Sequence, residues 1–207
     1  MLRIIGGEFR SRRLETPDDE STRPMASRAK ESVFNLLRGW FDDTAVLDLF
    51  AGVGTMGLEA ISRGASKAVM VERHRTIVRL LERNIASLRC ADRAVVVPGD
   101  ALSPAVIASA RAVAERFDIV FIDPPYAIME TEEGRARVFA QVTRCRALMG
   151  DTGFVVLRTP LDPGRVDHRI AGFDGPEVHR YGKEMRVLLY APSKADGASG
   201  DGRSGTA

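Results

Sequence analysis

Asp123-Pro-Pro-Tyr126 is the stretch whose residue types point most directly to chemistry. Two adjacent prolines fix the backbone and remove two N–H donors, which leaves carbonyl oxygens that can face a ligand. The Asp123 carboxylate and the Pro124 carbonyl together could accept hydrogen bonds from the exocyclic amine of a base, while Tyr126 stacks on that base. Such bonds would draw the amine's delocalised lone pair toward a tetrahedral nitrogen that can attack a methyl group. A rigid turn after a strand is the structural alternative.

A glycine turn between an apolar run and a helical pattern indicates a nucleotide-like cofactor. It spans Val46–Gly57, and its glycines let backbone approach a ligand in front of the free N–H groups of a helix start. The spacing of Gly52, Gly54 and Gly57 also fits the dinucleotide fingerprint, which leaves NAD open. Asp48 favours S-adenosylmethionine, because it can accept from a charged amino group but would be repelled by a pyrophosphate. A tight connection that binds nothing is the remaining alternative.

Four acidic residues follow successive predicted strands, namely Asp48, Glu72, Asp100 and Asp123. Ligands of an open parallel sheet bind beyond the carboxyl ends of its strands, so these acids should meet at one edge. Without donors or cations they would repel each other. S-adenosylmethionine supplies donors: its ammonium for Asp48, its ribose hydroxyls for Glu72 and its adenine amine for Asp100. Taken singly, Glu72 or Asp100 is equally well explained as a helix cap or surface acid.

The elements that must position these residues alternate between strand and helix patterns after Val46. That alternation predicts an α/β fold with a doubly wound, Rossmann-like, mostly parallel sheet covered on both faces. Apolar runs such as Phe117–Ile122 are typical of strands buried on both sides. A late strand at 187–190, reached without a clear crossover helix, should join the sheet antiparallel. The other predicted strands are 46–49, 68–71, 94–97, 119–122 and 154–157, and the predicted helices are 55–63, 75–88, 104–116 and roughly 132–148.

The first forty residues form a predicted extension of this domain. Uneven alternation around Gly6-Gly7 predicts a small antiparallel hairpin over residues 2–16, followed by a loop at 17–22. Apolar residues at helical spacing predict a helix over 27–40 that packs on the main domain. We therefore expect an extension at 1–40, a cofactor-binding domain at 41–192 and a disordered tail at 193–207.

Composition bounds the class of protein. The 207 residues are 44% hydrophobic and 28% charged, which is typical of a soluble globular domain. No apolar run has the length of a membrane span and the first residues do not form a secretory signal, so a cytoplasmic protein is predicted. Cys90 and Cys145 are isolated and have no His cluster nearby, so no metal site or disulfide is indicated.

The distribution of charge is more informative than its sum, which is only +2. Arg10, Arg12 and Arg13 form a basic group near the start of the chain, and Arg28 and Lys30 follow. A local patch of this kind can hold nucleic-acid phosphates even where the total charge is modest. We predict these five residues as RNA contacts, with a solvated surface as the alternative.

Several segments resemble a known family. Asp48–Gly52, Gly99–Ala101 and Asp123–Tyr126 resemble the class I S-adenosylmethionine-dependent methyltransferases that modify exocyclic amines. More narrowly, the chain is similar to the RsmD-type family, which methylates N2 of a guanine in 16S ribosomal RNA. That similarity rests on Arg3-Ile-Ile-Gly-Gly, Thr22-Arg-Pro, Arg28-Ala-Lys-Glu and Val33-Phe-Asn-Leu-Leu, and it extends from Arg3 to about Tyr190.

The resemblance implies a seven-stranded sheet, S-adenosylmethionine as cofactor, and ribosomal RNA or the assembling small subunit as partner of a monomeric enzyme. It implies catalytic roles for Asp123, Pro124, Pro125 and Tyr126. The implied cofactor-binding residues are Asp48, Ala51, Gly52, Gly54, Glu72, Arg73, Asp100 and Ala101.

Two segments depart from the family pattern. Met25-Ala-Ser replaces more polar residues, and Phe154-Val-Val-Leu-Arg-Thr stands where the family often has a strand ending in Glu. A DNA adenine-N6 methyltransferase would share the chemistry, but it usually carries a target-recognition segment for which this chain has no room. An NAD-dependent oxidoreductase would need a substrate domain. An RNA-binding module that keeps the cofactor fold without turnover is the non-enzymatic alternative.

Overall fold

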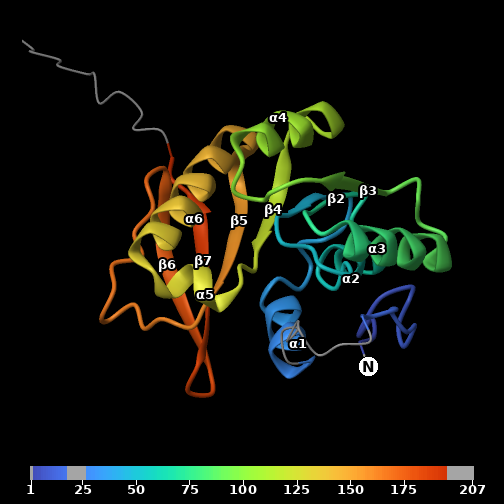
Figure 1. The fold of residues 1–207 in the computed structure, drawn as a ribbon, viewed down its shortest axis with the longest axis horizontal. Helices are drawn as coiled ribbons and strands as arrows, with labels where there is room; N and C mark the ends of the chain where they lie inside the picture. Colours follow the sequence, from blue (N-terminus) through green and yellow to red (C-terminus); the bar gives the residue numbers. More distant parts are fainter. Residues whose placement is uncertain (1, 18–26, 195–207) are drawn as a thin grey trace, which may run out of the picture.

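The computed structural model describes residues 2–17 and 27–194, which form one mixed sheet between two layers of helices (Figure 1). The strands are β1 (Ala45–Asp48), β2 (Lys67–Glu72), β3 (Ala94–Pro98), β4 (Phe117–Ile122), β5 (Met149–Thr159), β6 (Phe173–Tyr181) and β7 (Met185–Pro192). The helices are α1 (Ser27–Leu36), α2 (Gly57–Ser62), α3 (Arg75–Leu88), α4 (Pro104–Val113), α5 (Tyr126–Glu130) and α6 (Glu132–Cys145), followed by the 3-10 turn η1 (Arg146–Leu148).

The seven strands lie in the order β3-β2-β1-β4-β5-β7-β6. Strands β1 to β5 are parallel, while β7 pairs antiparallel with both β5 and β6. This confirms the predicted doubly wound, mostly parallel sheet with an antiparallel late strand. The chain progresses outward in opposite directions from the neighbours β1 and β4, so their carboxyl ends form the crevice where such sheets bind ligands.

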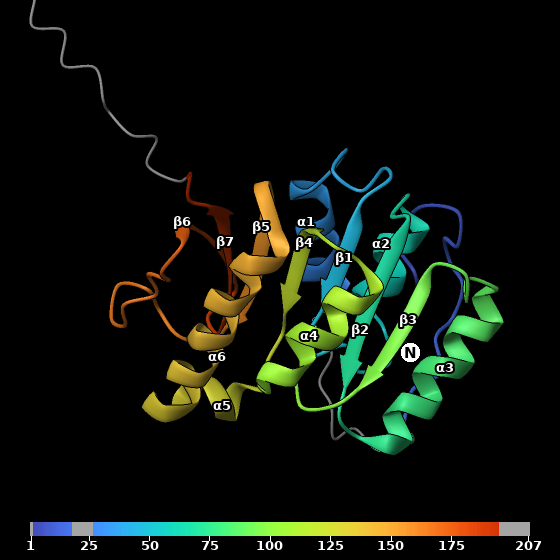
Figure 2. The same ribbon diagram turned by 90° about the horizontal axis from the view of Figure 1, so that it is seen from above.

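The two faces of the sheet are covered by different helices. Alternate residues along a strand point to opposite faces, so on β1 Val46 packs with α1, α2 and α3 while Leu47 packs with α4, α5 and α6. Figure 2 shows α4, α5 and α6 on one side of the strands, with α1 and α2 on the other. Both layers exclude water from the sheet, which agrees with the apolar runs that predicted these strands.

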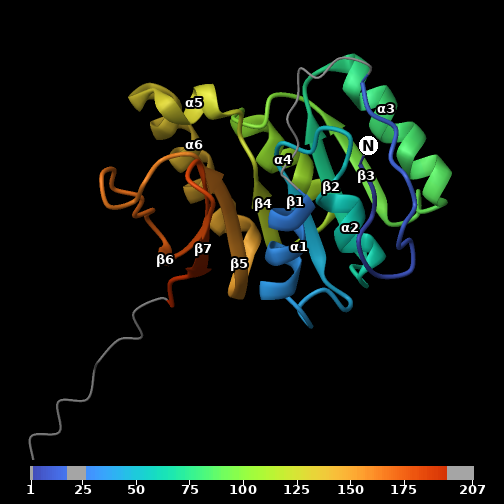
Figure 3. The same cartoon turned by 90° about the horizontal axis from the view of Figure 1, so that it is seen from below.

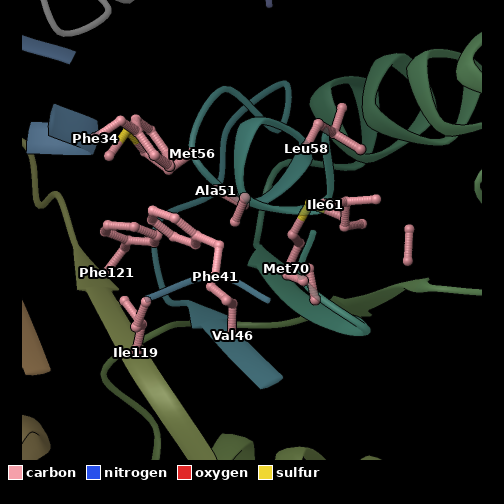
Figure 4. Packing of buried hydrophobic residues seen from close by; sticks show 14 of the residues in the cluster. Phe34, Phe41, Val46, Ala51, Met56, Leu58, Ile61, Met70, Ile119 and Phe121 are labelled. Carbon is pink, nitrogen blue, oxygen red and sulfur yellow. The ribbon is translucent and has the colours of Figure 1, made fainter. Parts of the chain in front are cut away.

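An aromatic cluster joins the N-terminal helix to the centre of the sheet (Figure 4). The ring of Phe34 on α1 lies 5.1 Å from that of Phe41 and 5.7 Å from that of Phe121 on β4, measured between centroids. All three are buried. Helix α1 is thereby fixed to the strand that leads directly into Asp123-Pro-Pro-Tyr126.

Residues 2–17 fold back on themselves, but less regularly than the predicted hairpin. They contain one isolated antiparallel bridge, between Arg3 and Arg13, and no strand among the residues described there. Their hydrogen bonds go mostly to the helical layer, for example from the amide of Glu8 to the carbonyl of Ser62 and from the amide of Glu15 to Asn84. The segment lies beside α2 and α3 in Figures 1 and 3.

Other differences from the predicted elements have local causes. Helix α1 ends at Leu36, because the chain turns through Gly39 at φ +85° and places Trp40 edge-on against Phe154. Helix α5 and strand β6 were not predicted. The first is only five residues long, and the second is an edge strand interrupted at Gly175-Pro176. In the part of the chain with assigned structure, no helix is both long and apolar enough to cross a bilayer.

Candidate active site

Asp48 lies at the end of β1 and is 1% exposed. Its Oδ2 accepts a hydrogen bond of 3.0 Å from the amide of Gly57 at the start of α2. Its Oδ1 is buried and has no partner among the residues described. Because a buried carboxylate oxygen without a donor is costly, this atom is suited to a ligand that brings a donor of its own.

Burial raises the pKa of Asp48 to about 7. The hydrogen bond from Gly57 and the backbone of Phe50 oppose the shift, whereas the negative charges of Asp123 and Glu72 add to it. Two of the acids predicted to converge on Asp48 therefore lie close enough to influence its ionisation. A cation bound among them would favour the ionised form.

Glu72, at the end of β2, holds the glycine turn in place. One carboxylate oxygen accepts from the amide of Gly52 at 3.1 Å, and the other accepts from the amide of His74 at 2.8 Å. Gly52 has φ +54°, and a Cβ built on it would meet nothing within 4 Å. The outer side of the turn is therefore open, and each Glu72 oxygen keeps a lone pair for a further donor.

The other two glycines of the turn are required for packing. Gly54 has φ +91°, and a Cβ there would lie 2.5 Å from Leu81. At Gly57 a Cβ would lie 2.6 Å from Met70 and would crowd the helix start that binds Asp48. The G-x-G-x-x-G spacing is thus explained here by the close packing of the turn on α3 at Gly54, by the packing of α2 on β2 at Gly57, and by the open position at Gly52.

The remaining predicted cofactor residues surround the same edge. Asp100 follows β3, caps the turn through the amide of Leu102 at 3.0 Å, and lies 3.6 Å from Arg137. The side chains of Ala51 and Ala101 are buried. Arg73 is exposed and its Nε lies 3.2 Å from His74. The chain order places Ala51, Arg73 and Ala101 shortly beyond β1, β2 and β3.

Asp123, directly after β4, forms an ion pair with Arg158 on the neighbouring strand β5. The guanidinium carbon of Arg158 also lies 4.9 Å from the centre of the Tyr126 ring, within cation–π distance. The Asp123 and Arg158 side chains are 18% and 12% exposed. Tyr126 begins α5, whose N-cap is Pro125, while Pro124 is buried and Pro125 exposed.

The pKa of Asp123 is raised by burial, and Arg158 acts in the opposite direction through its charge and hydrogen bond. Asp48 and Asp123 stand at the ends of adjacent strands, on the face covered by α1 and α2. The unpartnered oxygen of one and the proline-flanked acid of the other are therefore brought together, as the sequence predicted.

The predicted RNA contacts divide into two groups. Arg10, Arg12 and Arg13 are exposed, and Arg12 donates to the Ser87 carbonyl at 2.7 Å. The prediction for Lys30 is wrong: this side chain is 4% exposed, lies 3.1 Å from Glu59 and donates to the Arg3 carbonyl at 2.8 Å. Arg28 lies in the first turn of α1, but its side chain falls outside the described part, as do residues 18–26 and 195–207 with the predicted loop and tail.

Two residues with important contacts, Glu59 and Arg158, were not predicted from the sequence. Glu59 on α2 is 0% exposed and accepts from the amides of Ile5 and Gly6 at 2.7 and 2.8 Å, besides its pairs with Lys30 and Arg63. Burial lowers the pKa of Lys30, and Glu59 opposes that shift. Arg158 could have been found from its place at the end of a predicted strand beside the one that ends in Asp123. No cluster of three or more metal-ligating side chains occurs among the residues with assigned positions.

A family model and the curated relatives of the chain point to the same family. A family model described as "Conserved hypothetical protein 95" matches residues 2–190. The Escherichia coli protein "Ribosomal RNA small subunit methyltransferase D" is 40% identical over 128 residues, which cover 60% of each chain. The Bacillus subtilis protein "Putative rRNA methyltransferase YlbH" is 32% identical over 155 residues, covering 75% of this chain and 80% of the relative.

Solved structures extend the similarity over almost the whole chain. The "Putative methyltransferase yhhF" of Escherichia coli superposes with a TM-score of 0.74 at 28% identity, covering 92% of this chain and 97% of that one. A hypothetical protein of Thermus thermophilus superposes with a TM-score of 0.70 at 30% identity and covers 91% and 98% of the two chains.

Proposed function

The chain belongs to the Conserved hypothetical protein 95 family, the RsmD family, and from that premise we propose that it transfers a methyl group from S-adenosylmethionine to the exocyclic N2 amine of a guanine in 16S ribosomal RNA. The observation that carries the proposal is the meeting of two half-sites at adjacent strand ends. Asp48 offers a buried acceptor without a partner among the described residues, and Asp123-Pro-Pro-Tyr126 offers acceptors beside an aromatic ring.

The residues present fit the cofactor. The free Oδ1 of Asp48 is placed for an ammonium donor, and the open turn at Gly52 leaves room for a ligand against backbone. Glu72 would accept from the ribose hydroxyls and Asp100 from the adenine amine, while Ala51, Arg73 and Ala101 line the same edge. When bound, S-adenosylmethionine supplies a methyl group on a sulfonium, which is already activated for transfer.

The protein's own contribution to the reaction is to position and polarise the amine. Asp123 and the carbonyl of Pro124 would each accept one N–H of the guanine amine, so that its lone pair points away from both. Pro125 fixes the backbone between the Pro124 carbonyl and Tyr126, whose ring would stack on the base. In-line placement of two reacting atoms accounts for a large share of catalysis in such transfers.

The target guanine must leave its stack to reach this edge, which costs a few kcal/mol. Contacts to phosphates can offset that cost without reading sequence. We assign them to Arg10, Arg12 and Arg13, which are exposed on the segment that lies along α2 and α3. Ribosomal RNA, free or in an assembling small subunit, is the partner that this arrangement fits.

The experiment that tests the proposal separates cofactor binding from turnover. Asp123→Ala and Tyr126→Ala should reduce methyl transfer by at least about a hundredfold and leave the dissociation constant for S-adenosylmethionine within about twofold, since both residues are assigned to the base. Glu72→Ala should instead weaken cofactor binding by about 1.5–3 kcal/mol, the cost of a lost charged acceptor. Equal turnover by the Asp123 variant and the parent would refute the assignment.

Substrate choice distinguishes this function from the DNA adenine alternative. Small-subunit RNA from a strain without the protein, the same RNA already modified, and adenine-containing duplex DNA should be offered in parallel. Incorporation of methyl groups into guanine of the unmodified RNA supports the proposal. Incorporation into DNA adenine would favour the alternative.

A further inference from the structure

We propose that Arg158 is a positioning residue for the target base, which orients Asp123 and the Tyr126 ring and holds Asp123 in its ionised form. This inference rests on the proposed function, because it concerns the same amine-binding group. Arg158 lies outside both the glycine turn and Asp123-Pro-Pro-Tyr126. It stands near the end of β5, where the sequence departs from the family pattern.

Arg158 touches both members of the base-binding group at once. Its Nε faces Oδ1 of Asp123, and its guanidinium lies over the Tyr126 ring at 4.9 Å. Asp123 follows β4, Tyr126 begins α5 and Arg158 lies near the end of β5, so one side chain ties three elements together. A planar guanidinium suits this double contact, because it can donate to a carboxylate in its plane while its face lies on an aromatic ring.

The ion pair leaves one Asp123 oxygen for substrate. Oδ1 accepts from Arg158, whereas none of the amides and side chains that the structure describes donates a hydrogen bond to Oδ2. Oδ2 is therefore the acceptor for the guanine amine. Arg158 sets the rotation of the carboxylate, and with it the direction in which Oδ2 points.

Burial makes an ionised Asp123 costly without a cation. Asp48 at the end of the adjacent strand β1 is a nearby acid, and Arg158 on β5 is a cation in contact with Asp123. Burial raises the pKa of Asp123 and Arg158 opposes that rise. Loss of Arg158 should therefore raise the pKa further, and a protonated Asp123 would present an O–H toward a group that also donates.

The test compares Arg158→Gln and Arg158→Lys with the parent in single turnovers at saturating S-adenosylmethionine, from about pH 5.5 to 9, a window that spans the range of raised carboxyl pKa values. Saturation removes the titration of Asp48, which is expressed in cofactor affinity. Arg169→Gln is the matched control, because Arg169 also pairs with an aspartate, Asp167, but on an exposed loop. The pKa of Asp123 is measured separately by carbon NMR of labelled aspartate carboxyls, assigned with Asp123→Asn.

We expect the acidic limb of the Arg158→Gln profile to move to higher pH by at least about one unit, which is about a tenfold loss of rate on that limb. The acidic limb of Arg158→Lys should lie close to that of the parent, because lysine keeps the positive charge. Its KM for RNA should still be raised, because lysine lacks the planar contact with Tyr126. Arg169→Gln should match the parent. In the Asp123→Asn background, adding Arg158→Gln should leave the acidic limb unchanged.

Three results would overturn the inference. The first is an Arg158→Gln profile that is lower at every pH without a shift, together with an unshifted Asp123 carboxyl in NMR. The second is faster turnover by either variant, which would make Arg158 an obstacle to the base. The third is a normal KM for RNA in Arg158→Lys, alongside an Arg158→Gln variant that does not fold, because the planar guanidinium would then not position the base and Arg158 would be a support of the fold only.

The NMR titration keeps this inference separate from the proposed function. It needs no RNA, so an unchanged Asp123 pKa refutes the role of Arg158 even where guanine methylation is demonstrated. Conversely, a shifted pKa with no methylation of small-subunit RNA by the parent refutes the proposed function and leaves the link between Arg158 and Asp123 in place.

Discussion

Asp48 and Gly57 close the glycine turn from its two ends: the Asp48 Oδ2 accepts a hydrogen bond from the Gly57 amide at 3.0 Å, and the Asp48 Oδ1 beside it stays unpaired within the described chain. The same carboxylate therefore fastens the first strand to the first helix of the crevice and keeps a buried acceptor open. An acceptor of this kind costs stability in the empty protein and is compensated when a donor arrives.

The first prediction is that Asp48 makes the ligand-free protein less stable as pH rises. Its folded pKa of about 7 lies above the ordinary value of 3.8, so the folded state holds a proton that the unfolded state has lost between these values. Stability from this group is complete below about pH 4 and is lost as pH rises through 7, by on the order of 2–3 kcal/mol between pH 5 and pH 8. Urea unfolding at both pH values should show a smaller decline in Asp48→Asn. Parallel declines would contradict the assignment.

The second prediction concerns the cofactor itself. An ammonium donor needs ionised Asp48, so the affinity for S-adenosylmethionine should be about tenfold weaker at pH 6 than at pH 8, as expected for a pKa near 7. Calorimetry in buffers of different ionisation enthalpy should detect proton release on binding near pH 7. The Asp48→Asn variant keeps the ligand's own titration but should lose the contribution of the protein. Identical pH dependence in both proteins would mean that the ammonium binds elsewhere.

A third prediction addresses the N-terminal segment, which Glu59 fastens to α2. Glu59→Ala removes the acceptor of the Ile5 and Gly6 amides and leaves Lys30 buried without its counter-charge. We expect a loss of about 3–5 kcal/mol in the free energy of unfolding and faster proteolysis within residues 1–16. Glu82→Ala on the exposed side of α3 is the control and should change stability by less than about 0.5 kcal/mol. Similar behaviour of the two variants would show that Glu59 is not the attachment point.

A fourth prediction tests the RNA surface. Changing Arg10, Arg12 and Arg13 to Ala should leave cofactor affinity intact, weaken binding to small-subunit RNA, and flatten its salt dependence by close to one unit per lost phosphate contact. Its control is the triple change of Arg111, Arg116 and Arg144, which are exposed on the layer formed by α4 and α6. Unchanged RNA binding across a salt series would show that the RNA-binding surface does not include these three arginines of the N-terminal segment.

Much of the sheet could be predicted from sequence, because buried parallel strands consist of continuous runs of apolar residues. Strand β6 could not, since an edge strand with one exposed face carries charged residues such as Glu177 and Arg180 and is interrupted by Gly175-Pro176. The seventh strand was therefore expected only from the family resemblance. Short elements such as α5 lie below the length at which helical spacing is informative.

The candidate site divides in the same way. The glycine turn and Asp123-Pro-Pro-Tyr126 are continuous in the chain, so their residue types could be interpreted together. The link between Asp123 and Arg158 joins residues 35 positions apart and depends on the side-chain direction at two strand ends. Lys30 was misassigned for a related reason: a lysine on a helix gives no sign in sequence that a buried Glu59 will take its charge.

The most direct measurement for the central claim is nucleoside mass spectrometry of 16S ribosomal RNA after incubation with the protein and isotopically labelled S-adenosylmethionine. The RNA should come from a strain that lacks the protein, as free RNA and as small subunits, with Asp123→Ala as the parallel reaction. We predict labelled N2-methylguanosine at close to one per RNA with the parent and none with Asp123→Ala. Label on another nucleoside, or equal label from the variant, would contradict it.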